Sequence, residues 1–342
     1  MARITIKDVA KEAGVSVSTV NRLLKGEGGL KGATAQAIKD AASKLGYHGL
    51  RTIDYRLSAQ RPKFKFGFLL LQPTRTFYKM LGAALEAAAA RSEMPQIETH
   101  IVFAEDLSPD FFASKLLELG ETCDAIGIVA PVHPQITRMI DKVSGDGTPI
   151  FALISQLSAM GSFNYVGLDN WKVGRMSAWA FHKFSQKPGK IGVLVGNHRF
   201  RCQEMNEAGF RSYFREYAPE FQLIESIPTF ETRSVAQEVT EQLLAEHPDL
   251  SGLFISGGGI SGALSALRSS GKAGIIDCVG YELMEPTREG LLDGTLSMVI
   301  SHPLQRLAET TIAGMIKSKL EGATHSIQTT ILPFDILTRE NI

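Results

Sequence analysis

Cysteine and net charge are both scarce in this chain. Cys123, Cys202 and Cys278 lie far apart in 342 residues, and neither their odd number nor their spacing suits a metal site. We therefore expect reduced, buried thiols and no metal or other cofactor. The 36 basic and 36 acidic residues cancel, which argues against a uniformly basic nucleic-acid-binding protein.

Long apolar runs are also missing. No run of about 18 apolar residues occurs, so no membrane-spanning helix and no membrane partner are expected. The opening residues Met-Ala-Arg-Ile-Thr-Ile-Lys contain no apolar signal core, which predicts a cytoplasmic protein. The length indicates two or three domains, and the 44% hydrophobic content is ample for buried cores.

The charge that is present is unevenly distributed. Up to Arg61 basic residues outnumber acidic ones about two to one, and the remainder is correspondingly acidic. This asymmetry is typical of a small DNA-binding head joined to a neutral body.

The first 25 residues predict two short helices. Thr5 suits an N-cap with Asp8 in the first turn, Gly14 ends the helix, and Ser16 caps the next one. The apolar positions recur at helical spacing, at Ile6, Val9, Ala10, Ala13, Val20, Leu23 and Leu24. Such a pair is a helix-turn-helix. Its second helix would expose Val17, Ser18, Asn21 and Arg22, which suit a major groove; a plain helical hairpin is the alternative.

The same stretch resembles the DNA-binding domain of the LacI (lactose-repressor) family. The resemblance rests on Thr-Ile-Lys-Asp-Val-Ala-Lys-Glu-Ala-Gly-Val-Ser-Val-Ser-Thr-Val and on Leu45-Gly46-Tyr47 after a third helix at 34–45. It implies an all-α head at 1–47 that contacts double-stranded operator DNA. The implied DNA contacts are Thr5, Ser16, Val17, Ser18, Thr19, Asn21, Arg22, Lys25, Lys31, Thr34, Tyr47 and Leu57.

Residues 48–62 correspond to the family's hinge. In the family this segment folds to a helix on DNA, and a leucine from each subunit enters the minor groove. Gly49-Leu50 replaces the usual Pro-Asn, and Arg56-Leu57 comes one position late, so the register stays open. We assign the wedge to Leu57, with Ile53 as the alternative, and a plain linker without a wedge is a further possibility.

From residue 63 to 342 strand and helix patterns alternate. Buried strands are expected at 64–71, 97–103, 124–130 and 149–154, then at 190–195, 222–227, 252–255 and 275–281, with helices between them. This order predicts two doubly wound parallel sheets. The resemblance implies that they form a bilobed sensor like periplasmic sugar-binding proteins. The strand at 296–301 would return toward the first lobe, the helix at 304–320 would belong to that lobe, and a final strand is expected at 327–336. In such sheets ligands bind beyond the carboxyl ends of the strands.

Family positions suggest which residues face the ligand. The loop after the first strand holds Gln72, Arg75, Phe77 and Tyr78, and aromatic faces pack against sugar rings. Later positions implied by the resemblance are Asn170, Phe230, Gly257, Glu282 and His302. The alternatives are a core role for Phe77 and Tyr78, a helix cap at Asp169-Asn170, and an exposed loop acid at Glu282.

Three departures change the expected pocket. Asn206 stands where the family has its sugar-binding arginine, so we consider Arg199 and Arg201 as replacements. Gly257-Gly258 replaces the family's Asn-Asp, and His302-Pro303 replaces Gln-Pro. The ligand therefore cannot be copied from a well-known member.

These observations predict a regulator, most simply a repressor, that binds a pseudo-palindromic operator as a homodimer or tetramer. A small sugar-like effector between the lobes would control it, and a polyol, organic acid or nucleobase is the alternative effector. A solute-binding protein is opposed by the intact helix-turn-helix. An enzyme is opposed by the absence of a paired nucleophile and base at a recognised spacing.

Overall fold

The computed structural model describes residues 4–27, 30, 32–59, 62–93, 95–158, 163–321 and 327–342. The chain divides into two compact units, one formed by residues 1–64 with 92–97 and the other by 65–91 with 98–342. Each unit is described by itself.

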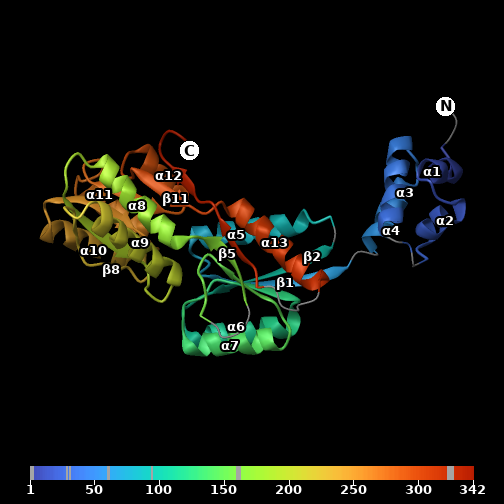
Figure 1. Cartoon of the computed structure of the whole chain (residues 1–342), viewed down its shortest axis with the longest axis horizontal. Coiled ribbons are helices and arrows are strands. Elements are labelled where there is room, and N and C mark those ends of the chain that lie inside the picture. Colours follow the sequence, from blue (N-terminus) through green and yellow to red (C-terminus); the bar gives the residue numbers. More distant parts are fainter. Residues whose placement is uncertain are drawn as a thin grey trace. The chain divides into compact units, whose positions relative to one another are not determined.

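The first unit is helical (Figure 1). It contains α1 (Ile6–Glu12), α2 (Val17–Lys25), α3 (Gly32–Leu45) and α4 (Leu50–Ala59). Its core comes from all four helices, with Val9, Val20, Ile38 and Ile53 each fully buried. Gly26 ends α2 at a φ of 76°, a left-handed value that glycine adopts at little cost. The helix-turn-helix prediction is confirmed, and α4 adds a fourth helix to the same core.

The first lobe of the second unit is a six-stranded sheet of order β12-β5-β4-β3-β1-β2. Its strands are β1 (Lys63–Leu71), β2 (Gln96–Ala104), β3 (Ala125–Ile128), β4 (Ile150–Leu153), β5 (Asn164–Leu168) and β12 (Thr329–Leu332). Its helices are α5 (Thr76–Ala90), α6 (Pro109–Thr122), α7 (Pro134–Gly145) and α13 (Leu304–Leu320). Figure 1 shows α5 and α13 on one face and α6 and α7 on the other. Covering both faces explains why β3 and β4 are buried along their whole length.

The second lobe repeats this winding. Its sheet has the order β13-β11-β10-β9-β6-β7, and β8 also pairs with β6. The strands are β6 (Lys190–Val195), β7 (Gln222–Leu223), β8 (Ile227–Pro228), β9 (Leu250–Ile255), β10 (Asp277–Tyr281), β11 (Met298–Ser301) and β13 (Asp335–Leu337). The helices are α8 (Asn170–Phe184), α9 (Arg201–Tyr217), α10 (Arg233–Glu246), α11 (Ile260–Ser269) and α12 (Glu285–Leu292). The predicted pair of doubly wound parallel sheets is confirmed.

Two glycines allow α8 and α9 to meet backbone to backbone. A Cβ on Gly174 would overlap the carbonyl of Asn206, and a Cβ on Gly209 would overlap the carbonyl of Trp171. The chain crosses between the lobes after β5, after β11 and after β12.

Three sequence predictions differ from the structure. The strand expected at 222–227 is two short pieces, β7 and β8, and the helix α12 was not predicted. The single closing strand expected at 327–336 is divided: β12 pairs parallel with β5 in the first lobe, and β13 pairs antiparallel with β11 in the second. A local pattern cannot show that consecutive strands belong to different sheets.

Candidate functional site

The helix α2 presents a polar, exposed face. Ser16 caps it, since its Oγ accepts from the Thr19 amide at 3.2 Å. Val20 and Leu23 are buried, whereas Val17, Ser18 and Arg22 are exposed and Asn21 is half-buried. Short side chains around one guanidinium are a set that can read base edges. This face therefore remains our candidate for sequence reading.

Other predicted DNA contacts have structural roles in the head. Thr5 caps α1, and its Oγ1 and its amide donate to Asp8 Oδ2 at 2.7 and 2.8 Å; these bonds, the side-chain one above all, lower the pKa of Asp8. Lys25 is exposed and Thr34 is half-buried, so both can still reach a phosphate. Tyr47 is only 6% exposed and packs in the core, so its ring is not free to contact DNA. Lys31 lies outside the described residues.

The predicted hinge contains the helix α4, which packs with the head core. Ile53 is fully buried, so the alternative wedge residue is unavailable in this conformation. Leu57 is half-buried and packs against the same core. Arg56 Nε donates to the Leu24 carbonyl at 3.2 Å, and Lys39 pairs with Asp54 at 3.1 Å. In this structure α4 is anchored to the head by core packing and by polar contacts.

A cavity of about 490 Å³ lies between the lobes at the carboxyl ends of the two sheets. That position, at the point where strand order reverses, is where doubly wound sheets bind ligands. Its wall includes six of the predicted ligand residues: Gln72, Arg75, Phe77, Tyr78, Gly257 and Glu282. The volume falls in the range of small-molecule sites.

The other six predicted ligand residues do not line this cavity. Phe230 is 62% exposed, and Arg199 and Arg201 are exposed as well. Asn170, Asn206 and His302 are buried at the crossings between the lobes. Helix direction and loop conformation decide which of the predicted side chains enter the cavity, and these six stay predictions as ligand contacts.

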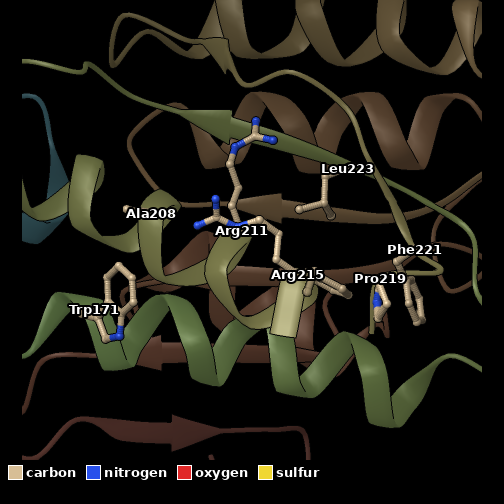
Figure 2. Close-up of a pocket in the computed structure, with 8 residues that line it drawn as sticks. Trp171, Ala208, Arg211, Arg215, Pro219, Phe221 and Leu223 are labelled. Carbon is tan, nitrogen blue, oxygen red and sulfur yellow. The ribbon is translucent and has the colours of Figure 1, made fainter. Parts of the chain in front are cut away.

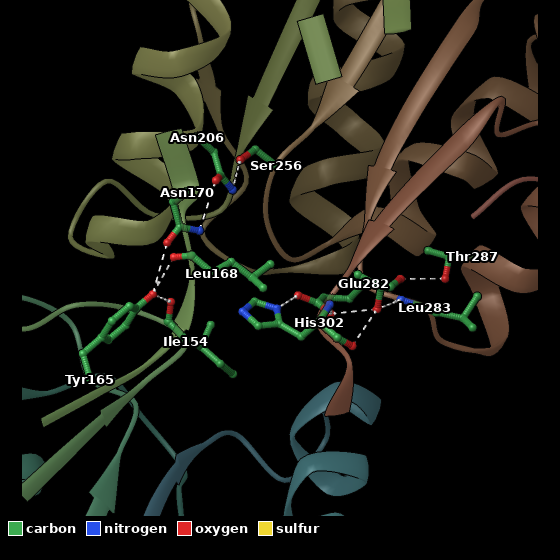
Figure 3. A network of polar contacts seen from close by, with 11 residues as sticks. Ile154, Tyr165, Leu168, Asn170, Asn206, Ser256, Glu282, Leu283, Thr287 and His302 are labelled. Carbon is green, nitrogen blue, oxygen red and sulfur yellow. Dashed lines mark hydrogen bonds and ion pairs between the residues drawn. The ribbon is translucent and has the colours of Figure 1, made fainter. Parts of the chain in front are cut away.

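Asn170 and Asn206 do not line the cavity but take part in a buried polar network (Figure 3). Asn170 Nδ2 lies 3.1 Å from the side-chain amide of Asn206, which lies 3.2 Å from Ser256 Oγ. The Tyr165 hydroxyl donates to the Leu168 carbonyl at 2.9 Å, beside the first crossing. This buried network ties the start of α8 to α9 and to the end of β9.

His302 holds Glu282 at the second crossing (Figure 3). His302 Nδ1 lies 2.5 Å from Glu282 Oε1. Glu282 Oε2 accepts from the His302 amide at 3.1 Å and from Ser301 Oγ at 3.2 Å. Among the described residues His302 Nε2 has no hydrogen-bond partner. Glu282 has a φ of 68°, a costly value for this residue type that the surrounding bonds maintain. Its carboxylate is therefore well supplied with protein donors.

Sequence reasoning missed Gln203, Glu231, Ser256 and Tyr281, all of which line the cavity. Glu231 directly follows the predicted Phe230, and of the two it is Glu231 that lines the cavity. Burial lowers the pKa of Arg75, but the nearby groups Glu231, Tyr78, Cys202 and Glu282 together outweigh this, so the pKa is raised overall. Burial also raises the pKa of Tyr78 and takes that of Cys202 to about 12.

A second hollow of about 520 Å³ lies on the second lobe (Figure 2). It is walled by Trp171, Ala208, Arg211, Phe214, Arg215, Pro219, Phe221 and Leu223. Arg211 is already paired there with Glu207 at 2.7 Å. Because this hollow lies away from the carboxyl ends of the two sheets, the cavity between the lobes is our candidate for the effector site.

Neither a membrane span nor a metal cluster is found in the described part of the chain. No helix there is long and apolar enough to cross a bilayer. No group of three or more His, Cys, Asp or Glu residues among those ranges could hold a metal ion.

Comparison with known proteins matches both units to described families. Residues 5–49 match the bacterial regulatory proteins of the lacI family. Residues 76–322 match a periplasmic binding protein domain.

Two curated relatives match nearly the full chain. The maltose regulon regulatory protein MalI of Escherichia coli is 25% identical over 95% of both chains. The ribose operon repressor of Bacillus subtilis is 26% identical over 92% of both chains. A glucose-galactose binding protein from Geobacillus stearothermophilus, GanP, has the same fold at a TM-score of 0.74 and 13% identity, covering 82% of this chain and 99% of its own.

Proposed function

This chain belongs to the lacI family of bacterial regulatory proteins, and we propose that it represses genes of carbohydrate uptake or metabolism. It would bind a pseudo-palindromic operator as a homodimer, in the cytoplasm where the DNA lies. A small sugar-like effector in the cavity between the lobes would change its DNA affinity. Its relatives are regulators and sugar-binding proteins, and we propose that it catalyses no reaction.

The observation that carries the DNA-binding role is the exposed face of α2. Val17, Ser18 and Arg22 face solvent while the opposite side of the helix fills the head core. A recognition helix needs one buried side and one exposed side, because it must pack on its own domain and still enter the major groove.

Support for a neutral effector comes from the charges around the cavity. Arg75 is already paired with Glu231, and Glu282 is a second carboxylate in the wall. Arg233 also lines the wall, so two cations face two carboxylates, and neither an anion nor a cation meets a net opposite charge. A neutral polyhydroxylated molecule can instead donate to the carboxylates and pack on Phe77 and Tyr78. This supports a sugar or polyol over an organic acid.

A thermal-shift screen tests the effector class. The panel should include neutral sugars, polyols, sugar acids and nucleobases. A specific ligand at 100 times its dissociation constant stabilises the protein by about 2.7 kcal/mol. We expect the shift from a neutral sugar or polyol. A shift from sugar acids alone would contradict the neutral assignment.

Selection of operator DNA from a random pool tests the regulatory role, and sedimentation tests the dimer. We expect a palindromic consensus and a dimer or tetramer, because two heads read two half-sites. Adding the ligand from the screen should change operator affinity, and operator should change ligand affinity by the same factor. A micromolar monomer with full operator affinity would contradict the dimeric arrangement.

A further inference from the structure

The cavity contains an ion pair that joins the two lobes. Arg75 is the N-cap of α5 in the first lobe, and Glu231 follows β8 in the second. Arg75 Nη2 lies 2.8 Å from Glu231 Oε2, with the two side chains 22% and 1% exposed. The pair is therefore largely shielded from water. In such a shielded place the attraction between opposite charges is stronger than at the surface.

Glu231 is held rigidly by its own lobe. Its Oε1 accepts from Gln203 Nε2 at 2.5 Å, and its Oε2 accepts from the Gly258 amide at 2.9 Å. Gln203 Oε1 in turn accepts from the amides of Gly196 and Asn197 at 2.6 and 2.9 Å. The carboxylate is thus fixed before any partner from the other lobe arrives.

The local backbone is shaped around this carboxylate. Glu231 has a φ of 62°, a left-handed value that costs free energy for a non-glycine residue. A Cβ on Gly196 or on Gly258 would overlap one of the carboxylate oxygens. The strained backbone at Glu231 and the lack of a side chain at Gly196 and Gly258 together allow the Glu231 carboxylate to point into the cavity.

Arg75 is oriented from the first lobe. Its guanidinium carbon lies 4.9 Å from the centre of the Tyr78 ring, a cation–π distance. Tyr78 is itself 6% exposed and part of the packed start of α5. One lobe therefore presents a positioned cation and the other a positioned carboxylate.

We propose that Arg75 and Glu231 form a latch that holds the lobes closed in the absence of effector. The latch would be a regulatory element of the proposed effector cavity. Its role in regulation rests on the proposed function, whereas the closure of the lobes by the ion pair does not. An effector that hydrogen-bonds to Arg75 and Glu231 would compete with the ion pair and so change the balance between closed and open lobes. Closure has to be biased by contacts that exist in one state and not in the other, and this ion pair is such a contact.

Distance measurement between spin labels tests the latch. Arg138→Cys in α7 and Glu238→Cys in α10 place one label on each lobe at exposed positions. The three native cysteines are buried, so labelling is selective. The labelled full-length chain is diluted with unlabelled chain to isolate distances within one molecule, and neither DNA nor ligand is added.

Without effector we expect a narrow distance distribution for the native latch. Arg75→Met should give a longer and broader distribution, and Arg75→Lys should restore part of the native one. Glu231→Gln removes the same pair from the other side while leaving an acceptor for Gly258, so it must lengthen the distance too. The matched control is Arg268→Met, which breaks the 2.8 Å pair with Asp293 inside the second lobe and should change nothing.

Native distances in both Arg75→Met and Glu231→Gln would overturn the latch. Lengthening in Arg268→Met as well would also overturn it, because the effect would then be general destabilisation. Operator and effector binding have their own separate tests, so failure of the latch would leave the proposed function standing. Loss of operator selection, in turn, would leave the distance result standing.

Discussion

Phe230 and Glu231 are neighbours in the chain, and their side chains point to opposite environments. Both have left-handed backbone conformations, with φ of 50° and 62°. Phe230 is 62% exposed, whereas Glu231 is 7% exposed and contacts Arg75, Gln203 and Gly258. The strained turn after β8 thus delivers a carboxylate to the cavity and leaves the aromatic ring outside.

The first prediction separates these two environments. Phe230→Ala should leave effector affinity unchanged, because its ring lies outside the cavity wall. Gln72→Ala removes a polar group from the wall and should weaken binding by about 0.5–1.5 kcal/mol. Calorimetry with the effector from the screen measures both variants. Loss of binding in Phe230→Ala would mean that the ring closes over the ligand.

The second prediction concerns the space around Glu231. Gly258→Ala places a Cβ against the Glu231 carboxylate and 2.8 Å from Arg75 Nη2. We expect a loss of about 1–3 kcal/mol in the free energy of unfolding of the second unit. Gly145→Ala in α7 is the control, since no atom lies within 4 Å of its added Cβ. Equal unfolding midpoints for the two variants would show that the site adapts.

The third prediction concerns the helix α4. Ile53→Ala leaves a cavity in the head core and should destabilise the head by about 2–5 kcal/mol. Hydrogen exchange of α1 to α4 in the full chain measures this without DNA. Tyr55→Ala removes a 68% exposed ring from the same helix and should leave exchange unchanged. Rapid exchange of α4 in the native chain would instead indicate a hinge that folds only on DNA.

The fourth prediction concerns sequence reading. Arg22→Ala should cost about 1–3 kcal/mol on the operator and relax one base position. Lys25→Ala is the comparison, since a phosphate contact should weaken operator and random DNA alike and reduce the salt dependence. Fluorescence anisotropy on both DNAs distinguishes them. An equal loss on the two DNAs for Arg22→Ala would reassign it to a phosphate contact.

The fifth prediction concerns the thiols. Burial raises the pKa of Cys202 to about 12, and burial raises the pKa of Cys123 and Cys278 as well. The reactive thiolate is therefore scarce, and a thiol reagent at about pH 8 should react slowly with the native chain. Three thiols should react at once in urea. Fast reaction located at Cys202 by mass spectrometry would contradict the prediction and indicate an opening of the cavity that this residue lines.

Local sequence patterns determined much of the architecture. Helical spacing and capping residues predicted α1 and α2 because those signals act within a few residues of each other. Alternating strand and helix patterns predicted both sheets, and the ends of α11 and α13 matched the expected 260–269 and 304–320. The loops that surround the cavity were also predicted, since ligand sites follow the carboxyl ends of parallel strands.

Only the tertiary structure decided which side chains enter the cavity. Arg75 and Glu231 lie in different lobes and meet through the folding of both sheets, so no local pattern links them. The choice between Phe230 and Glu231 depends on two left-handed backbone conformations that neither residue type favours. Likewise β12 and β13 join different sheets because the chain crosses between the lobes after Leu332. Spacing along the chain encodes helices and strands, whereas contacts across the cleft depend on where the two sheets come together.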